Sequence, residues 1–219
     1  MKRIRIILLG APGVGKGTQA ERLQKAFECA HISTGDMLRE SVREGTPLGE
    51  KAKAFMEKGE LVPDGLILDM VAERLRRKDC ENGFILDGFP RTVVQAEKLD
   101  GILNDLELEL DAVLSIDVSN DEIVKRLSKR FICTECGKIV TVKTESDTTC
   151  PYCQGAIQRR KDDEPDTVRH RLTVYDNQTK PLIQYYEDKG MLKKVDGVGS
   201  AEEVFERLIA SLGFSQETE

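Results

Sequence analysis

The sequence predicts an α/β fold in which a parallel sheet is covered by helices on both faces. Three observations predict it. Short apolar, β-branched runs alternate with amphipathic helical patterns, a glycine-rich turn follows the first run, and 219 residues give room for one good-sized domain. No linker rich in Pro, Gly or Ser divides the chain, so we expect one core domain with small insertions.

Five strands are expected, in the order in which their apolar runs occur. Residues 4–9, 83–87 and 112–118 read as strands buried on both faces, and residues 31–33 and 192–195 as shorter ones. Helical patterns lie between them, including 17–27, 121–130, 165–189 and 201–212. Residues 131–160 break the alternation, because they contain cysteines, threonines and charges but no long apolar period. We expect an insertion there that is too small for a hydrophobic core of its own and needs a cross-link, such as a metal ion or a disulfide, to be stable.

Composition and charge exclude several classes of protein. The charged fraction of 33% and the low aromatic content of 5% are ordinary for a soluble globular chain. A net charge of −6 disfavours a dedicated nucleic-acid binder, and no apolar run approaches the roughly 20 residues of a membrane span. The basic start and its short apolar run lead directly into the glycine turn, which disfavours a signal peptide. We therefore expect a cytoplasmic protein without nucleic-acid or membrane partners.

The glycine-rich turn, GAPGVGKGTQ at 10–19, nearly fits the phosphate-loop pattern G-x-x-x-x-G-K-[ST]. Such a loop points successive backbone N–H groups, and the positive end of the following helix, at one phosphate group. The alternative, an ordinary glycine turn with an incidental lysine, is disfavoured by the strand–turn–helix context. We expect the nucleoside triphosphate to be wrapped by Gly13, Val14, Gly15, Lys16, Gly17 and Thr18.

The hydroxyl of this loop is displaced by one position. GTPases and most ATPases use the Ser or Thr directly after the lysine as a Mg²⁺ ligand, but here Gly17 follows Lys16 and the hydroxyl belongs to Thr18. A carboxylate elsewhere must then serve the metal, and Asp87, at the end of a predicted strand, is the candidate. No N-K-x-D guanine-specificity element is present. The loop therefore favours a nucleotide kinase over a switch GTPase.

The loop resembles that of adenylate kinase when it is taken together with STGDMLR at 33–39, DGFPRT at 87–92, RKDD at 160–163 and Arg171. The resemblance spans nearly the whole chain and is to the long bacterial form with a zinc-binding lid. It implies the P-loop nucleoside monophosphate kinase fold and the Mg²⁺-dependent reaction ATP + AMP ⇌ 2 ADP by a monomer. It also implies a core of residues 1–32, 63–128 and 164–219, an AMP-binding unit of 33–62 and a lid of 129–163.

The resemblance also implies which residues act. For AMP these are Thr34, Arg39, Glu60, Leu61, Val62, Gly88, Phe89, Pro90, Arg91, Gln95, Arg160 and Arg171. ATP would be contacted, besides the phosphate loop, by Arg126, Arg130, Ile139, Val140 and Gly199. The catalytic groups would be Lys16, Arg91, Arg126, Arg160, Arg171 and Asp87. This inventory is physically coherent, because two nucleotides bring together about six negative charges that the arginines, the lysine and Mg²⁺ offset.

Four of the six cysteines form the pattern C-x₂-C-x₁₃-C-x₂-C, made by Cys133, Cys136, Cys150 and Cys153. Two such pairs supply four thiolates at tetrahedral reach, which is typical of a structural Zn²⁺ site, although iron also accepts four sulfur ligands. Free cysteines packed in a core are the alternative. A zinc-ribbon nucleic-acid module is another, disfavoured because the segment has no aromatic platform for bases.

The lid segment departs from the family pattern in several places. Its two cysteine pairs lie closer together than is expected of zinc-type lids, and two further departures concern the phosphoryl donor. Ile139 and Val140 stand where the family commonly has Thr-Tyr, and the proline-containing stretch that normally follows is missing. GTP as the donor therefore stays open beside ATP. A kinase for UMP or CMP resembles the chain in its core but has a short lid, which disfavours that alternative.

Overall fold

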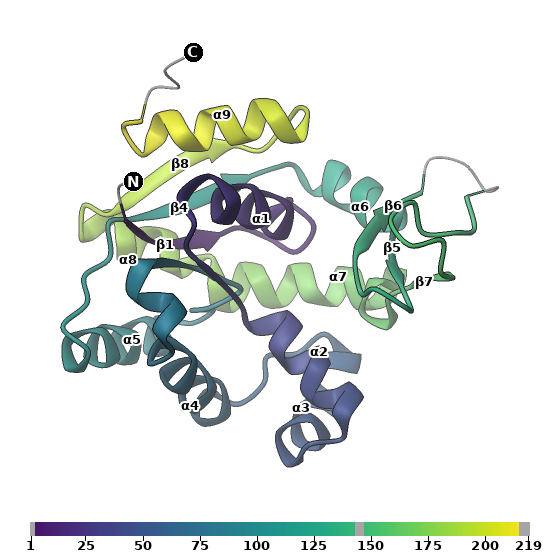
Figure 1. Ribbon diagram of the computed structural model, residues 1–219, viewed down its shortest axis with the longest axis horizontal. Coiled ribbons are helices and arrows are strands. Elements are labelled where there is room, and N and C mark those ends of the chain that lie inside the picture. The colour runs from purple at the N-terminus through teal and green to yellow at the C-terminus, as the bar shows by residue number, and fades with distance from the viewer. Residues whose placement is uncertain (1–2, 143–146, 215–219) are drawn as a thin grey trace.

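The computed structural model describes residues 3–142 and 147–214, and a five-stranded parallel sheet forms the centre of the molecule (Figure 1). Its strands are β1 (Ile4–Leu9), β2 (Ala30–Ser33), β3 (Gly83–Asp87), β4 (Ala112–Asp117) and β8 (Leu192–Asp196), in the spatial order β2-β3-β1-β4-β8. The register places Leu8 beside Asp87 and Leu114. The predicted five-stranded parallel sheet is confirmed.

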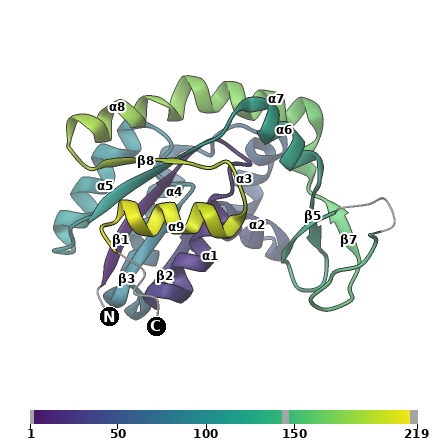
Figure 2. The ribbon, with the colours of Figure 1, turned by 90° about the horizontal axis from the view of Figure 1, so that it is seen from above.

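Alternate residues of the strands face two separate hydrophobic cores. Ile6 and Leu8 of β1 pack with α1 (Lys16–Phe27), α6 (Asn120–Ser128) and α9 (Ala201–Ser211). Ile7 and Leu9 pack on the opposite face with α4 (Asp64–Leu75), α5 (Val93–Asp105) and α8 (Pro181–Asp188). Figure 2 shows α8 and α9 on opposite sides of the sheet. Each fully buried leucine or isoleucine of these layers contributes about 1.5–3 kcal/mol to stability.

A pair of helices, α2 (Thr34–Glu44) and α3 (Pro47–Lys58), is inserted between β2 and α4. The Ser33 hydroxyl caps α2 by accepting from the Asp36 N–H at 3.3 Å, and Thr46 caps α3 in the same way at Gly49. A Cβ on Gly49 would lie 2.1 Å from the carbonyl oxygen of Ser41. Only glycine therefore allows the two helices to approach this closely.

A second, three-stranded sheet lies to one side of the core (Figure 1). It is antiparallel in the order β6-β5-β7, made by β5 (Arg130–Cys133), β6 (Ile139–Thr141) and β7 (Ile157–Arg159). Strands of three or four residues are too short to produce a hydrophobic period, which is why the sequence shows none here. Residues 143–146 of the expected lid lie outside the described residues.

The expected single helix over 165–189 is wrong in its middle. The structure has α7 (Pro165–Val174), a π-helical turn (Tyr175–Thr179) and then α8. The Lys180 N–H donates to the Tyr175 carbonyl at 2.8 Å, five residues back. Pro181 has no N–H to continue the α-helical ladder, so the chain accommodates it with one wider turn.

Two 3-10 helices, Lys78–Asn82 and Lys161–Asp163, complete the described elements. Within the two described ranges no helix is both long and apolar enough to cross a bilayer.

Candidate functional site

The loop between β1 and α1 turns sharply at the carboxyl end of the sheet. Gly10 has a φ of 143°, and a Cβ there would lie 2.6 Å from the Ile116 carbonyl oxygen. Gly13 has a φ of 87°, and its Cβ would lie 2.8 Å from the Leu127 side chain. No side chain caps α1, which begins at Lys16, so the free N–H groups of its first turn are available to an anion.

Lys16 lies inside this loop. Its Nζ donates to the carbonyl oxygens of Gly10 at 2.7 Å and Ala11 at 3.0 Å. Burial lowers the pKa of Lys16 to about 8, an effect that the nearby Asp87 carboxylate opposes and the cationic Arg91 strengthens. A buried ammonium with few anionic partners is a binding group for phosphate.

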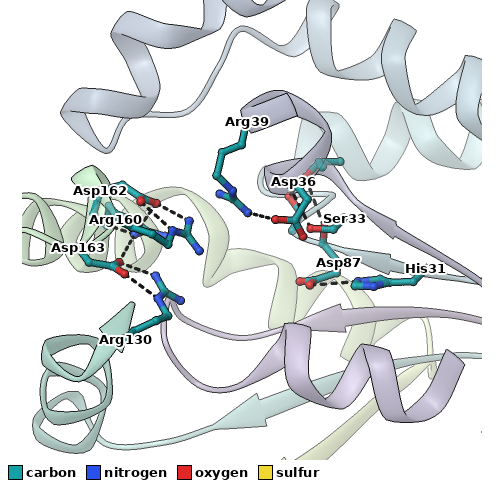
Figure 3. A network of polar contacts seen from close by, with 12 residues as sticks. His31, Ser33, Asp36, Arg39, Asp87, Arg130, Arg160, Asp162 and Asp163 are labelled. Atoms are coloured by element: carbon teal, nitrogen blue, oxygen red, sulfur yellow. Dashed lines mark hydrogen bonds and ion pairs between the residues drawn. The ribbon is translucent and has the colours of Figure 1, made fainter. Parts of the chain in front are cut away.

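Asp87 faces the same loop from the end of β3. Its carboxylate is buried, and a Cβ on Gly17 would lie 3.7 Å from its Oδ2. His31 of β2 approaches the same oxygen with Nε2 at 3.4 Å, as Figure 3 shows. The carboxylate thus lies beside the first turn of α1, near the loop where we expect an acid to serve the metal.

Hydrogen bonds connect the segment after β3 to the first residue of α2 and to the first turn of α5. The Thr34 hydroxyl donates to the Gly88 carbonyl at 2.9 Å, and Arg91 Nε donates to the same oxygen at 2.8 Å. The Arg91 N–H donates to Gln95 Oε1 at 2.7 Å. On α2, the Arg39 guanidinium bonds to Asp36 at 2.5 Å (Figure 3). Burial lowers the pKa of Arg91, an effect that the Asp87 carboxylate opposes and the cationic Arg39 strengthens.

Three arginines bind a pair of aspartates: Arg130 of β5, Arg160 directly after β7, and Arg171 of α7. Arg160 bonds both carboxylate oxygens of Asp162, at 3.0 and 2.8 Å, and Arg130 bonds both oxygens of Asp163, at 2.7 and 2.5 Å (Figure 3). Arg171 donates to the Asp162 carbonyl at 2.8 Å and to the Asp163 carboxylate at 3.2 Å. Burial lowers the pKa of Arg171 to about 10, and the neighbouring Arg160 lowers it further while Asp162 opposes the shift.

Arg126 of α6 connects the phosphate loop to the loop after β8. It donates to the Val14 carbonyl at 3.1 Å and to the Gly197 carbonyl at 3.0 Å, and its Nε pairs with Glu122 at 3.0 Å. Gly199, in the same loop after β8, has a φ of 119°. This arrangement brings two segments far apart in the sequence to one edge of the phosphate loop.

One pocket collects most of the residues expected to hold AMP. Its lining includes Lys16 together with Thr34, Arg39, Glu60, Leu61, Val62, Gly88, Pro90, Arg91, Gln95 and Arg171. Phe89 is 1% exposed and lies in the chain between Gly88 and Pro90, which line the pocket. Arg160 bonds to Asp162, another residue of the lining. The structure thus brings the expected AMP residues around Lys16.

The expected lid contacts Ile139 and Val140 lie on β6. The Val140 side chain is 7% exposed and packs with Cys133 and Cys150, whereas Ile139 is 42% exposed. Since these two side chains face opposite ways, only that of Ile139 is open to a ligand.

The four cysteines of the predicted metal pattern converge beside this strand. Their Sγ atoms all lie within 4.8 Å of one another, with 3.4 Å between Cys133 and Cys153 and 3.7 Å between Cys136 and Cys150. A tetrahedral site with Zn–S bonds of about 2.3 Å has sulfur–sulfur edges of about 3.8 Å. None of the six cysteines, all described, forms a disulfide. The cluster therefore fits a four-thiolate metal site.

Comparison with known proteins identifies the family of the chain. The adenylate kinase family model matches residues 8–191. The adenylate kinase of Thermodesulfovibrio yellowstonii is 50% identical over 212 residues, which cover 95% of this chain and 99% of that protein. The adenylate kinase of Archaeoglobus fulgidus is 48% identical over 212 residues, covering 95% and 98%. That of Ruminiclostridium cellulolyticum is 48% identical over 213 residues, covering 96% and 100%.

The chain belongs to the adenylate kinase family. This confirms the resemblance carried by the sequence motifs and the nucleoside monophosphate kinase fold inferred from it. The substrates of an adenylate kinase are adenine nucleotides. In this family member Lys16 of the phosphate loop lines one pocket together with Arg39, Arg91 and Arg171, and the Asp87 carboxylate lies beside Gly17 of the same loop. The roles of individual residues stay predictions.

Sequence reasoning missed two acidic residues that bond to neighbours near this adenylate kinase site, one to the pocket residue Gln95 and one to the exposed Lys161. Asp64, the first residue of α4, accepts a hydrogen bond from Gln95 Nε2 at 2.7 Å. Glu57 of α3 pairs with Lys161, next to the aspartate pair, at 3.4 Å. Neither carries a motif, and the partners lie 31 and 104 positions away in the sequence, so no local pattern could have found them.

Proposed function

We propose that this protein transfers the terminal phosphoryl group of ATP to AMP and forms two molecules of ADP. The observation that carries the proposal is membership of the adenylate kinase family over residues 8–191. The gathering of Lys16, Arg39, Arg91 and Arg171 around one pocket supports it, because the reaction requires two polyanions to approach each other. Family membership supports the predicted enzyme class, an ATP:AMP phosphotransferase.

ATP would be held by the phosphate loop and its neighbours. The N–H groups of Gly13 to Thr18 would surround the β- and γ-phosphates, and Lys16 would exchange its carbonyl contacts for phosphate oxygens. Arg126 and Arg130 would reach the triphosphate, and Gly199 would lie beside the adenine. Of the lid strand, Ile139 would contact the donor with its side chain and Val140 through its main chain.

AMP would occupy the pocket between α2, α3 and α5. Arg39 and Arg91 would bind its phosphate, since planar guanidinium groups bind phosphate in a bidentate way. Thr34, Gly88, Phe89 and Pro90 would shape the phosphate end. Residues 60–62 would line the ribose and base, and Gln95 would read the adenine edge.

The chemistry would rest on positioning and charge. The attacking group is a phosphate oxygen, which is already ionised near neutral pH because the second phosphate pKa is about 6, so no general base is needed. Arg160 and Arg171, whose guanidinium groups are held by Asp162, would stabilise the transferring phosphoryl group. Mg²⁺, when bound with the nucleotide, would neutralise phosphate charge, and the buried carboxylate beside Gly17 fits its water ligands.

The four cysteines would hold structural Zn²⁺. Sulfur fills all four positions, so the site has no open position for a substrate, and the metal would maintain the fold of the small sheet. Iron fits the same ligand set. Metal analysis of the purified protein distinguishes the two.

We further propose that residues 33–62 and 129–163 close over a core formed by 1–32, 63–128 and 164–219. Closure excludes water from the phosphoryl group, which limits hydrolysis of ATP. The protein would act as a cytoplasmic monomer without nucleic-acid or membrane partners.

Turnover measured by a coupled assay tests the proposed function. Each of ATP and GTP is paired with AMP, CMP, UMP and GMP in the presence of Mg²⁺. We expect rapid ADP formation with ATP and AMP alone. A preference for GTP would assign the altered lid strand a role in donor choice, and no turnover with AMP would refute the proposal.

A further inference from the structure

The side chain of Gln95 is held by two partners from different segments. Its Oε1 accepts from the Arg91 N–H at 2.7 Å, and its Nε2 donates to Asp64 Oδ1 at 2.7 Å. Gln95 is 2% exposed and lines the pocket proposed for AMP. Its own N–H donates to the Thr92 hydroxyl at 3.1 Å, which fixes the backbone at the start of α5.

These partners allow the amide of Gln95 only one orientation. A peptide N–H can only donate, and a carboxylate can only accept. Turning the amide by 180° would place its NH₂ group against the Arg91 N–H and its oxygen against the Asp64 carboxylate. Both contacts would be repulsive and buried, so the chemistry of the partners fixes which atom is oxygen and which is nitrogen.

A fixed amide presents a fixed pattern to a ligand. A primary amide has two N–H donors and two acceptor lone pairs. Asp64 uses one donor and Arg91 uses one acceptor, which leaves one of each for a base in the pocket.

Adenine matches this pattern. Its 6-amino group donates and the ring nitrogen at position 1 accepts, so an amide can make both hydrogen bonds at once. Hypoxanthine and guanine carry an oxygen at position 6 and an N–H at position 1, which reverses the order. In the same base pose, both contacts with a fixed amide become repulsive.

We propose that Asp64 is a positioning residue that makes the acceptor site specific for adenine, an inference that rests on the proposed function. Asp64 acts through Gln95 and does not itself touch AMP. A purely structural role is the competing explanation, since Thr92-x-x-Gln95 is a helix-capping pattern. However, Gln95 Oε1 accepts from Arg91 and not from Thr92, and capping does not require Asp64.

Asp64→Asn tests the proposal, because a carboxamide both donates and accepts and would remove one of the two constraints on Gln95, leaving only that of the Arg91 N–H. IMP is the probe, since it differs from AMP only at position 6 and the adjacent ring N–H. We expect the KM for AMP to rise about tenfold with kcat within about twofold. The ratio of kcat/KM for AMP to that for IMP should fall by at least about tenfold. Calorimetric titration of AMP and IMP without a donor should show the same change in relative affinity.

Two further variants control for effects on the fold. Asp69→Asn removes an exposed carboxylate from the same helix and should leave KM, kcat and the base ratio unchanged. Asp64→Ser, whose hydroxyl also donates and accepts, should lower the AMP:IMP ratio as Asp64→Asn does. Thermal melting establishes that each variant is folded.

The outcomes separate this inference from the proposed function. A folded Asp64→Asn variant with the wild-type AMP:IMP ratio would overturn the inference and leave the kinase activity standing. If neither Asp64 variant folds, the wild-type protein can still overturn the inference, since a kcat/KM for IMP within about tenfold of that for AMP contradicts a fixed amide. Wild-type protein that does not phosphorylate AMP at all would refute the proposed function itself.

Discussion

The Arg126 guanidinium donates to the main-chain oxygen of Val14 at 3.1 Å and so connects α6 directly to the phosphate loop. The same side chain donates to the Gly197 carbonyl, in the loop after β8, at 3.0 Å. One planar, multidentate cation thus holds together the two loops proposed to surround ATP. The two contacts come from different nitrogens of the guanidinium, Nη1 to Val14 and Nη2 to Gly197, whereas the donors of a lysine all sit on one nitrogen and cannot reproduce this spread.

Arg126→Lys should therefore impair ATP more than AMP. We expect the KM for ATP to rise about tenfold and kcat to fall about 10- to 100-fold, with the KM for AMP nearly unchanged. Steady-state kinetics with each nucleotide varied in turn measure the asymmetry. Lys125→Met, at an exposed position of the same helix, is the matched control. Equal losses for both substrates would argue against a donor-side role for Arg126.

Replacing Lys16 by Met should leave the fold intact and abolish most activity. The ammonium is the charged group at the centre of the phosphate loop, and removing it takes several kcal/mol of stabilisation from the transition state. We expect kcat to fall by about 10³ or more, as measured by single-turnover formation of ADP. A folded variant with near wild-type turnover would contradict the assignment of the loop.

The wild-type enzyme should lose efficiency with ATP above about pH 8. Burial lowers the pKa of Lys16 to about 8, so in the free enzyme the ammonium loses its proton, and with it the phosphate-binding charge, as pH rises through this value. kcat/KM for ATP reports the free enzyme and should fall on the alkaline side. The limb of kcat should lie at higher pH, because bound phosphate favours the charged amine. A kcat/KM that is flat to pH 9.5 would be inconsistent with this environment.

The sequence predicts the central sheet well and the contacts between its insertions poorly. The strand at 83–87 is visible because continuous burial leaves a continuous apolar run, and Gly10 and Gly13 are visible because close backbone approach admits only glycine. The bond from Gln95 to Asp64 leaves no such trace, because it depends on how α4 packs against α5. Similarly, the π-helical turn before Pro181 replaces a helix that periodicity alone predicts as continuous.

Asp162→Asn should destabilise the protein at neutral pH. Burial alone would raise the pKa of Asp162, but Arg160 and Arg171 outweigh it and hold that pKa well below its ordinary range. The lowered pKa means that Asp162 stabilises the fold above about pH 4 and loses this contribution as pH falls towards the folded-state pKa. The variant should lose about 2–3 kcal/mol at pH 7, because Arg160 loses its bidentate carboxylate and Arg171 keeps only Asp163 as a counter-charge.

Urea unfolding between pH 7 and pH 2 measures this difference, which should shrink below about pH 4. The control is Asp166→Asn, whose side chain is 95% exposed and pairs only across a helix turn with Arg169, so its effect should stay under about 0.5 kcal/mol. A constant difference between Asp162→Asn and wild type across the whole range would show that the carboxylate charge is not the cause.

Cys150→Ser should remove the metal and weaken the small sheet without changing the chemistry. Cys150 is fully buried among Cys133, Val140 and the other thiolates, and the described part of this segment has little other core, so metal binding supplies its folding free energy. We expect one zinc per wild-type chain by elemental analysis, less in the variant, and a lower melting temperature. At low temperature kcat should stay near wild type, since no metal position is open to a substrate. Cys29→Ala, a buried cysteine outside the cluster, should keep the metal. Loss of activity at every temperature in a folded Cys150→Ser variant would instead indicate a metal that takes part in catalysis.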